Sequence, residues 1–107
     1  MTDKELLELA AKAAGYSIHS DAWARIYSDE GKTLFMGNHG PAWNPLTDDG
    51  DALRLEVALK ATAVWEPMRG EWSVGAIVNG EFKWLAFHEI RNRAATKAAA
   101  EIGKAMP

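Results

Sequence analysis

The sequence predicts an α+β fold: an antiparallel sheet of about five strands, in two hairpins plus one strand, flanked by three helices in the order α-β-β-α-β-β-β-α. Two amphipathic segments with helical spacing lie at the ends of the chain. Between them, aromatic and β-branched residues alternate with polar ones around turn sequences. A length of 107 residues suits a single domain, residues 1–107.

The composition excludes several classes of protein. There is no cysteine, hence no disulfide, thiolate nucleophile or sulfur-ligated zinc, and no apolar leader follows Met1, so we expect a reducing cytoplasm. No apolar run approaches the ~20 residues that cross a bilayer, so no membrane partner is expected. The net charge of -3 makes a duplex-binding module less expected, although a local basic patch stays open.

The first helix is expected to begin at Thr2-Asp3-Lys4-Glu5, because Thr2 can accept from the amide of Glu5 while the Glu5 side chain reaches back. An apolar stripe follows at three- and four-residue intervals, formed by Leu6, Leu9, Ala10 and Ala13. Gly15 is a suitable stop. After it, Ala22 to Tyr27 and Lys32 to Met36 are predicted to form a hairpin.

A second helix is predicted from about Asp48 to Lys60. Pro45 disfavours helical geometry before it, and Thr47 or Asp48 can cap the new helix. The residues expected to face inward are Ala52, Leu55, Ala58 and Leu59. Two surface ion pairs are expected from the spacing, Asp51 with Arg54 and Glu56 with Lys60.

The second half of the sheet is predicted as a strand from Ala61 to Glu66 and a hairpin of Trp72 to Val78 with Glu81 to Phe87. Asn79-Gly80 is the dipeptide that a type I′ turn favours, which pairs Val78 with Glu81 and Gly75 with Trp84. This register places one set of residues on the face expected to be the core: Gly75, Ile77, Phe82, Trp84 and Ala86. The opposite face is expected to be covered only at its far end.

A last helix, roughly Ile90 to Ala105, is rich in alanine. Alanine has high helix propensity but offers little area, so this helix is expected to pack its backbone close to a sheet. Its basic residues line the remaining surface: Arg91, Arg93, Lys97 and Lys104.

Three segments resemble short proteins of tailed bacteriophages and prophages, the phage ABA-sandwich domain family: Trp43 to Leu55, Lys4 to Ala11 and Ala98 to Met106. Trp43-Asn44-Pro45-Leu46 is the most specific part. The resemblance implies a phage or prophage accessory protein in the host bacterial cytoplasm. It brings no catalytic residues, because no activity is established for the family.

No catalytic constellation is recognisable, so an enzyme is not expected. His19, His39 and His88 are far apart and have no ligand spacing, which predicts no metal and no cofactor. The acidic cluster Asp48-Asp49-Gly50-Asp51 lacks the alternating oxygens and the closing Glu of a calcium loop, so capping is preferred. The serines lack a nucleophile elbow, and there is no phosphate-binding glycine loop.

The favoured function is therefore non-enzymatic binding of a host or phage protein, conceivably a bacterial defence complex, with a homo-oligomer left open. The candidate partner-binding residues are Trp23, Arg25, Tyr27, His39 and Trp43, since Trp, Tyr and Arg dominate interfaces. The alternative is a nucleic-acid-binding module using Arg69, Trp72, Arg91, Arg93 and Lys97.

Overall fold

The computed structural model describes residues 2–15, 27–28, 33–35 and 42–107. Its helices are α1 (Asp3–Ala13), α2 (Asp49–Leu59) and α3 (Arg91–Ala105). Its strands are β1 (Tyr27–Ser28), β2 (Thr33–Phe35), β3 (Ala42–Trp43), β4 (Thr62–Glu66), β5 (Glu71–Val78) and β6 (Glu81–His88). The predicted first hairpin is confirmed where it is described, because β1 pairs with β2 in antiparallel register.

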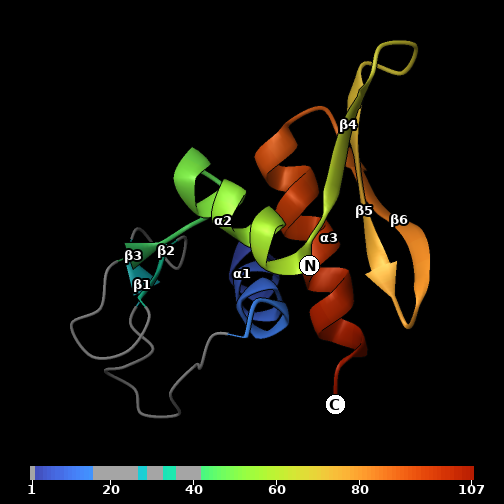
Figure 1. Cartoon of the computed structure of the whole chain (residues 1–107). Coiled ribbons are helices and arrows are strands. Elements are labelled where there is room, and N and C mark those ends of the chain that lie inside the picture. Colours follow the sequence, from blue (N-terminus) through green and yellow to red (C-terminus); the bar gives the residue numbers. More distant parts are fainter. Residues whose placement is uncertain (1, 16–26, 29–32, 36–41) are drawn as a thin grey trace.

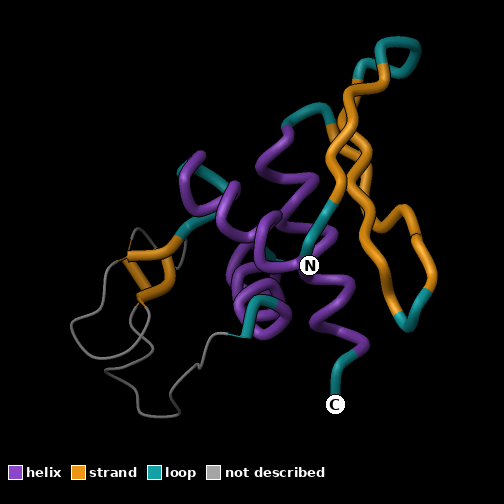
Figure 2. The backbone as a smooth tube through the Cα atoms, in the orientation of Figure 1, coloured by secondary structure: helices purple, strands orange, loops and turns teal. Residues whose placement is uncertain are grey.

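Helix α3 lies at the centre of the molecule (Figure 1). Helices α1 and α2 lie on one side of it and the β4-β5-β6 sheet on the other, while β1-β2-β3 lies beyond α1 and α2 (Figure 2). The helix is buried on two faces because its small residues admit close neighbours: Ala94, Ala95, Ala98, Ala99, Ala100 and Gly103. The expectation that this helix packs its backbone closely is confirmed, against a helix as well as a sheet.

The first core cluster joins the three helices. Leu7 of α1, Leu55 of α2 and Ala99 of α3 are fully buried in it together with Trp43. Glycine is required at residue 103, because a Cβ there would overlap the carbonyl oxygen of Leu9. The side chain of Thr2 accepts from the amide of Glu5 at 3.2 Å, as the capping sequence predicted.

The second core cluster lies between α3 and the sheet. Val74 and Ala86 face Ala94 and Ala98 there, with Ala63 packed at the margin. The predicted turn is confirmed: Asn79 and Gly80 both have positive φ, 53° and 81°, and Val78 pairs with Glu81.

The predicted sheet is wrong in its construction, although the α+β class holds. In place of one sheet of about five strands, the described residues form two separate three-stranded antiparallel sheets, β1-β2-β3 and β4-β5-β6. The additional strand is β3, which pairs with β2 through Leu34 and Trp43. The sequence before Trp43 is rich in turn residues, which hid this short strand.

The predicted core face of the second hairpin is also wrong. Gly75 pairs with Trp84 as predicted, but a β-bulge between Val74 and Gly75 makes Val74 pair with Ala86. The extra residue turns Ala86 toward α3, while Ile77, Phe82 and Trp84 point away from the helix. Small residues form the centre of the inner face, where Val74 and Ala86 meet the alanine surface of α3, and the larger Trp72 packs at the margin of this cluster.

Several predicted features of α2 are confirmed, among them the burial of Ala52 and Leu55, and two are wrong. Arg54 bonds Asp51 at 2.7 Å, as the spacing predicted. Ala58 is exposed, whereas Glu56 is buried and bonds Arg91 of α3 instead of Lys60. A partner 35 residues away cannot be inferred from helical spacing.

Candidate protein-binding face

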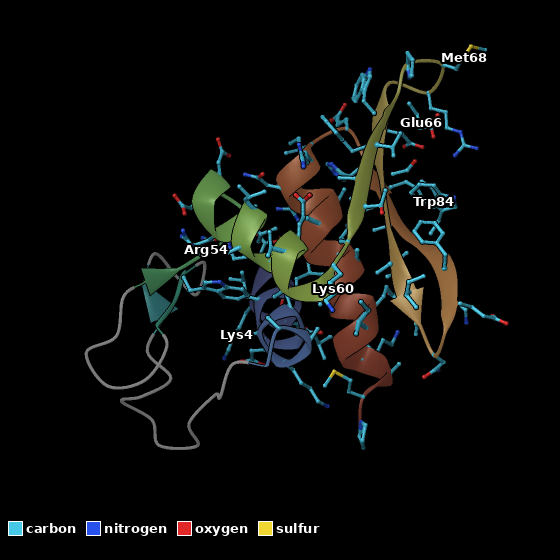
Figure 3. All side chains as sticks on the ribbon, viewed as in Figure 1. Lys4, Arg54, Lys60, Glu66, Met68 and Trp84 are labelled. Carbon is cyan, nitrogen blue, oxygen red and sulfur yellow. The ribbon has the colours of Figure 1, made fainter. Side chains whose placement is uncertain are left out.

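Five large apolar side chains gather on the face of the β4-β5-β6 sheet that is turned away from α3. We call this surface the outer sheet face: Val64, Ile77, Phe82, Trp84 and Phe87. Figure 3 shows Trp84 standing on that side, opposite the helices. Their exposed fractions range from 39% to 63%, which is high for residues of this size. No helix of the described chain covers this face.

The rings on the outer sheet face are held in fixed positions. Phe82 and Trp84 stand edge to face, with their centroids 4.9 Å apart and an interplanar angle of 88°. Both lie over Gly75, where a Cβ would come within 2.7 Å of Phe82 Cζ and 2.9 Å of Trp84 Cε3. Glycine at this position therefore seats the aromatic pair on the sheet.

The centre of the outer sheet face carries no formal charge, because the other outward positions between the five residues are Thr62, Ser73 and Gly75. Charges lie at its β4-β5 end. Arg69 stands 5.8 Å from the ring centroid of Phe87 and 3.7 Å from the carboxylate of Glu71. An apolar centre with a charged margin is the usual anatomy of a protein interface.

The acidic cluster at residues 48–51 caps a helix, as the sequence predicted. The Asp48 side chain accepts from the amide of Asp51 at 2.8 Å. Asp51 is buried and accepts from the amide of Asn44 at 2.9 Å and from Arg54. The Asn44 side chain in turn accepts from the amide of Leu46. These carboxylates are occupied in seating α2 on the Trp43-Asn44-Pro45 segment.

The predicted partner-binding residues do not form a described surface. Trp23, Arg25 and His39 lie outside the described residues, and Tyr27 is described only by its backbone pairing with Leu34. Trp43 is 2% exposed and belongs to the core between the helices. It therefore supports the fold and offers no side-chain area to a partner.

The predicted nucleic-acid-binding residues are dispersed, and each of the three arginines is paired with a carboxylate. Arg91 donates to both oxygens of Glu56, at 2.9 and 3.2 Å, and its guanidinium lies 4.9 Å from the ring centroid of Trp72. The hydrogen bonds that Arg91 donates to Glu56 raise the pKa of the Arg91 guanidinium. Arg93 bonds Asp3 at 3.2 Å. Arg69 lies at the far end of the sheet and Lys97 on the flank of α3.

Two cavities flank α3. The larger, about 600 Å³, lies between α1, α3 and β6 and is lined by Leu6, Leu85, Ala86, Phe87, Arg93, Lys97 and Glu101. The smaller, about 360 Å³, lies between α2 and α3, where Glu56 bonds Arg91 and Asp49 accepts from Asn92. Within the described ranges, no three His, Asp or Glu side chains are grouped to hold a metal ion.

The outer sheet face was not predicted from the sequence, because Ile77, Phe82 and Trp84 were expected to lie in the core. A signal was available: an alanine-rich helix packs best on small residues, and the large rings then have to point outward.

None of the helices in the described ranges has the length and apolarity needed to cross a membrane.

No family model matches the chain, and no curated protein matches it in sequence. In structure it is similar to a phage protein from Bacillus cereus ATCC 14579, known from a 2.0 Å crystal structure. The TM-score is 0.64 at 16% sequence identity, and the alignment covers 100% of this chain and 92% of that chain. At this identity the likeness concerns the fold alone. The chain therefore shares the fold of a phage protein.

Proposed function

We propose that the protein is a bacteriophage or prophage accessory protein that acts without catalysis, by binding another protein of the phage or of its bacterial host through the outer sheet face. The fold likeness to a phage protein supports the phage setting. The host cytoplasm as the location is part of the proposal. Host defence or regulatory complexes belong to the range of partners.

The observation that carries this proposal is the exposure of three aromatic side chains on one sheet face whose centre carries no formal charge: Phe82, Trp84 and Phe87, each 43% to 45% exposed. The largest contiguous apolar patch of a soluble monomer, typically about 300–600 Å², is often a functional surface. Rigid aromatic rings are also the side chains that supply most binding energy at protein interfaces.

A capture experiment tests the proposal. The tagged chain is incubated with lysates of host bacteria. Parallel lysates also contain the products of the other phage genes and an untagged copy of this chain. Wild type is expected to retain a protein that Trp84→Ser fails to retain. Val57→Ser is the matched control, because Val57 is an exposed apolar residue on α2, away from the sheet. Equal retention by wild type and both variants would contradict the proposal. Turnover in a substrate screen without any retained protein would also contradict it.

A further inference from the structure

We infer that the occupant of the outer sheet face is a second copy of this chain, so that two β4-β5-β6 sheets pack face to face in a symmetric dimer. The inference rests on the proposed function, because it names the partner of the same surface.

The apolar area of the face approaches what a dimer needs. The five side chains expose on the order of 400–500 Å² of apolar surface, taking about 150–250 Å² for a whole aromatic side chain. Two such faces bring together about 800–1,000 Å², and their polar margins extend this toward the roughly 1,200–2,000 Å² of a stable interface. A smaller or more polar partner surface would leave part of the rings in water.

The shape of the face also suits packing against an identical face. It is the surface of an antiparallel sheet, and two sheets pack through interdigitated side chains at a spacing of about 10 Å. Phe82 and Trp84 are already fixed by Gly75, so little conformational entropy is lost when a second sheet covers them.

Charge at the margin favours a two-fold contact over a strongly charged partner. The β4-β5 end carries both signs, since Arg69 and Glu71 lie 3.7 Å apart. In a symmetric dimer, each copy presents the same margin to the other, so a margin of one sign would repel. A margin of both signs can exchange ion pairs across the axis, and the uncharged centre offers nothing to a polyanion.

Sedimentation equilibrium over a wide range of protein concentration tests the inference directly. Wild type is expected to be a dimer at micromolar concentration. Ile77→Lys places a charge on the outer sheet face at a residue that is 63% exposed, and it is expected to raise the dimer dissociation constant on the order of 30-fold or more. Val57→Lys is the matched control at 68% exposure, and it is expected to remain a dimer. Thermal melts confirm that each variant folds.

The absence of cysteine allows a second readout that needs no loss of binding. A cysteine introduced by Ile77→Cys is expected to react slowly with a thiol reagent at high protein concentration and quickly at low concentration. One introduced by Val57→Cys is expected to react at the same rate throughout.

The outcomes separate the inference from the proposed function. A wild-type monomer at all concentrations, or a dimer unaffected by Ile77→Lys, overturns the inference. If a monomeric wild type still captures a lysate protein through Trp84, the proposed function stands without it. If neither self-association nor capture depends on the outer sheet face, both are wrong.

Discussion

The peptide nitrogen of Asn44 donates a hydrogen bond of 2.9 Å to Oδ2 of Asp51, and both residues are buried. The bond fixes the extended segment before Pro45 onto the first turn of α2. The other carboxylate oxygen of Asp51 accepts a hydrogen bond of 2.7 Å from Arg54. One carboxylate thus joins β3, the turn and the helix, which is why this segment organises the fold around it.

Asp51→Ala is therefore expected to lower the free energy of unfolding by about 2–3 kcal/mol, because it removes a charged acceptor and leaves the buried amide of Asn44 without its bond. Chemical denaturation measures the change. Asp49→Ala is the control: Asp49 is exposed and accepts only at the surface, from Asn92, so a loss of well under 1 kcal/mol is expected. Equal losses in the two variants would contradict this role for Asp51.

Gly103→Ala is expected to lower the free energy of unfolding by about 3 kcal/mol or more, because the new Cβ would overlap the backbone of Leu9 and push α1 away from α3. Backbone atoms cannot move aside as a flexible side chain can. Gly50→Ala in α2 is the matched control, since its Cβ would meet only the guanidinium of Arg54 and the carboxylate of Asp48. Greater helix propensity there is expected to stabilise the protein by up to about 1 kcal/mol. Thermal denaturation of the two variants, with opposite signs, checks the expectation.

The pair of Arg91 and Glu56 ties α3 to α2, with Glu56 8% exposed and Arg91 43% exposed. Arg91→Ala is expected to lower the free energy of unfolding by about 1–3 kcal/mol, because it leaves a buried carboxylate without its donor. Arg93→Ala is the control: the more exposed Arg93–Asp3 pair is expected to contribute about 0–1 kcal/mol. A double-mutant cycle with Glu56→Gln isolates the coupling energy.

The pH dependence of the stability that this pair contributes follows from the direction in which the pKa of Arg91 is shifted. Glu56 raises the pKa of Arg91 in the folded protein. A raised pKa contributes stability that is fully present below the unfolded value and is lost as the pH rises through the folded value. Both values lie in strongly alkaline solution. The difference in stability between wild type and Arg91→Ala is therefore expected to stay constant from neutral to moderately alkaline pH, and a fall in that range would contradict the assignment.

Local signals in the sequence were enough to predict the elements but not the side of the sheet that is buried. Asn79-Gly80 predicted the turn and the pairing of Gly75 with Trp84, because a two-residue turn fixes the register. The bulge beyond it adjoins Gly75, and a glycine inside a strand often marks such an irregularity, but the glycine does not say that Ala86 turns to the opposite face. Size was then misleading, since Phe82 and Trp84 were assigned to the core although the alanine surface of α3 meets the small residues Val74 and Ala86, with Trp72 only at the margin.

Long-range pairing explains the other differences. Asp48 was correctly predicted as a cap of α2, because capping depends on residues three apart. The burial of Glu56 depends on Arg91, which chain separation hides. The basic surface of α3 is also smaller than predicted, because Arg91 and Arg93 pair with carboxylates of α2 and α1.

Gly75→Ala tests whether the seating of the aromatic pair serves binding. Its Cβ would lie 2.6 Å from the carbonyl oxygen of Lys83 and would also meet both rings, so the rings must tilt. A loss of about 1–3 kcal/mol in the free energy of unfolding is expected, together with weaker self-association in sedimentation. Thr62→Ala is the control, because Thr62 pairs with Gly75 on the same face but leaves the rings in place. It is expected to associate like wild type. Normal association by Gly75→Ala, at a protein concentration where the variant is folded, would show that the fixed ring geometry is not needed for contact.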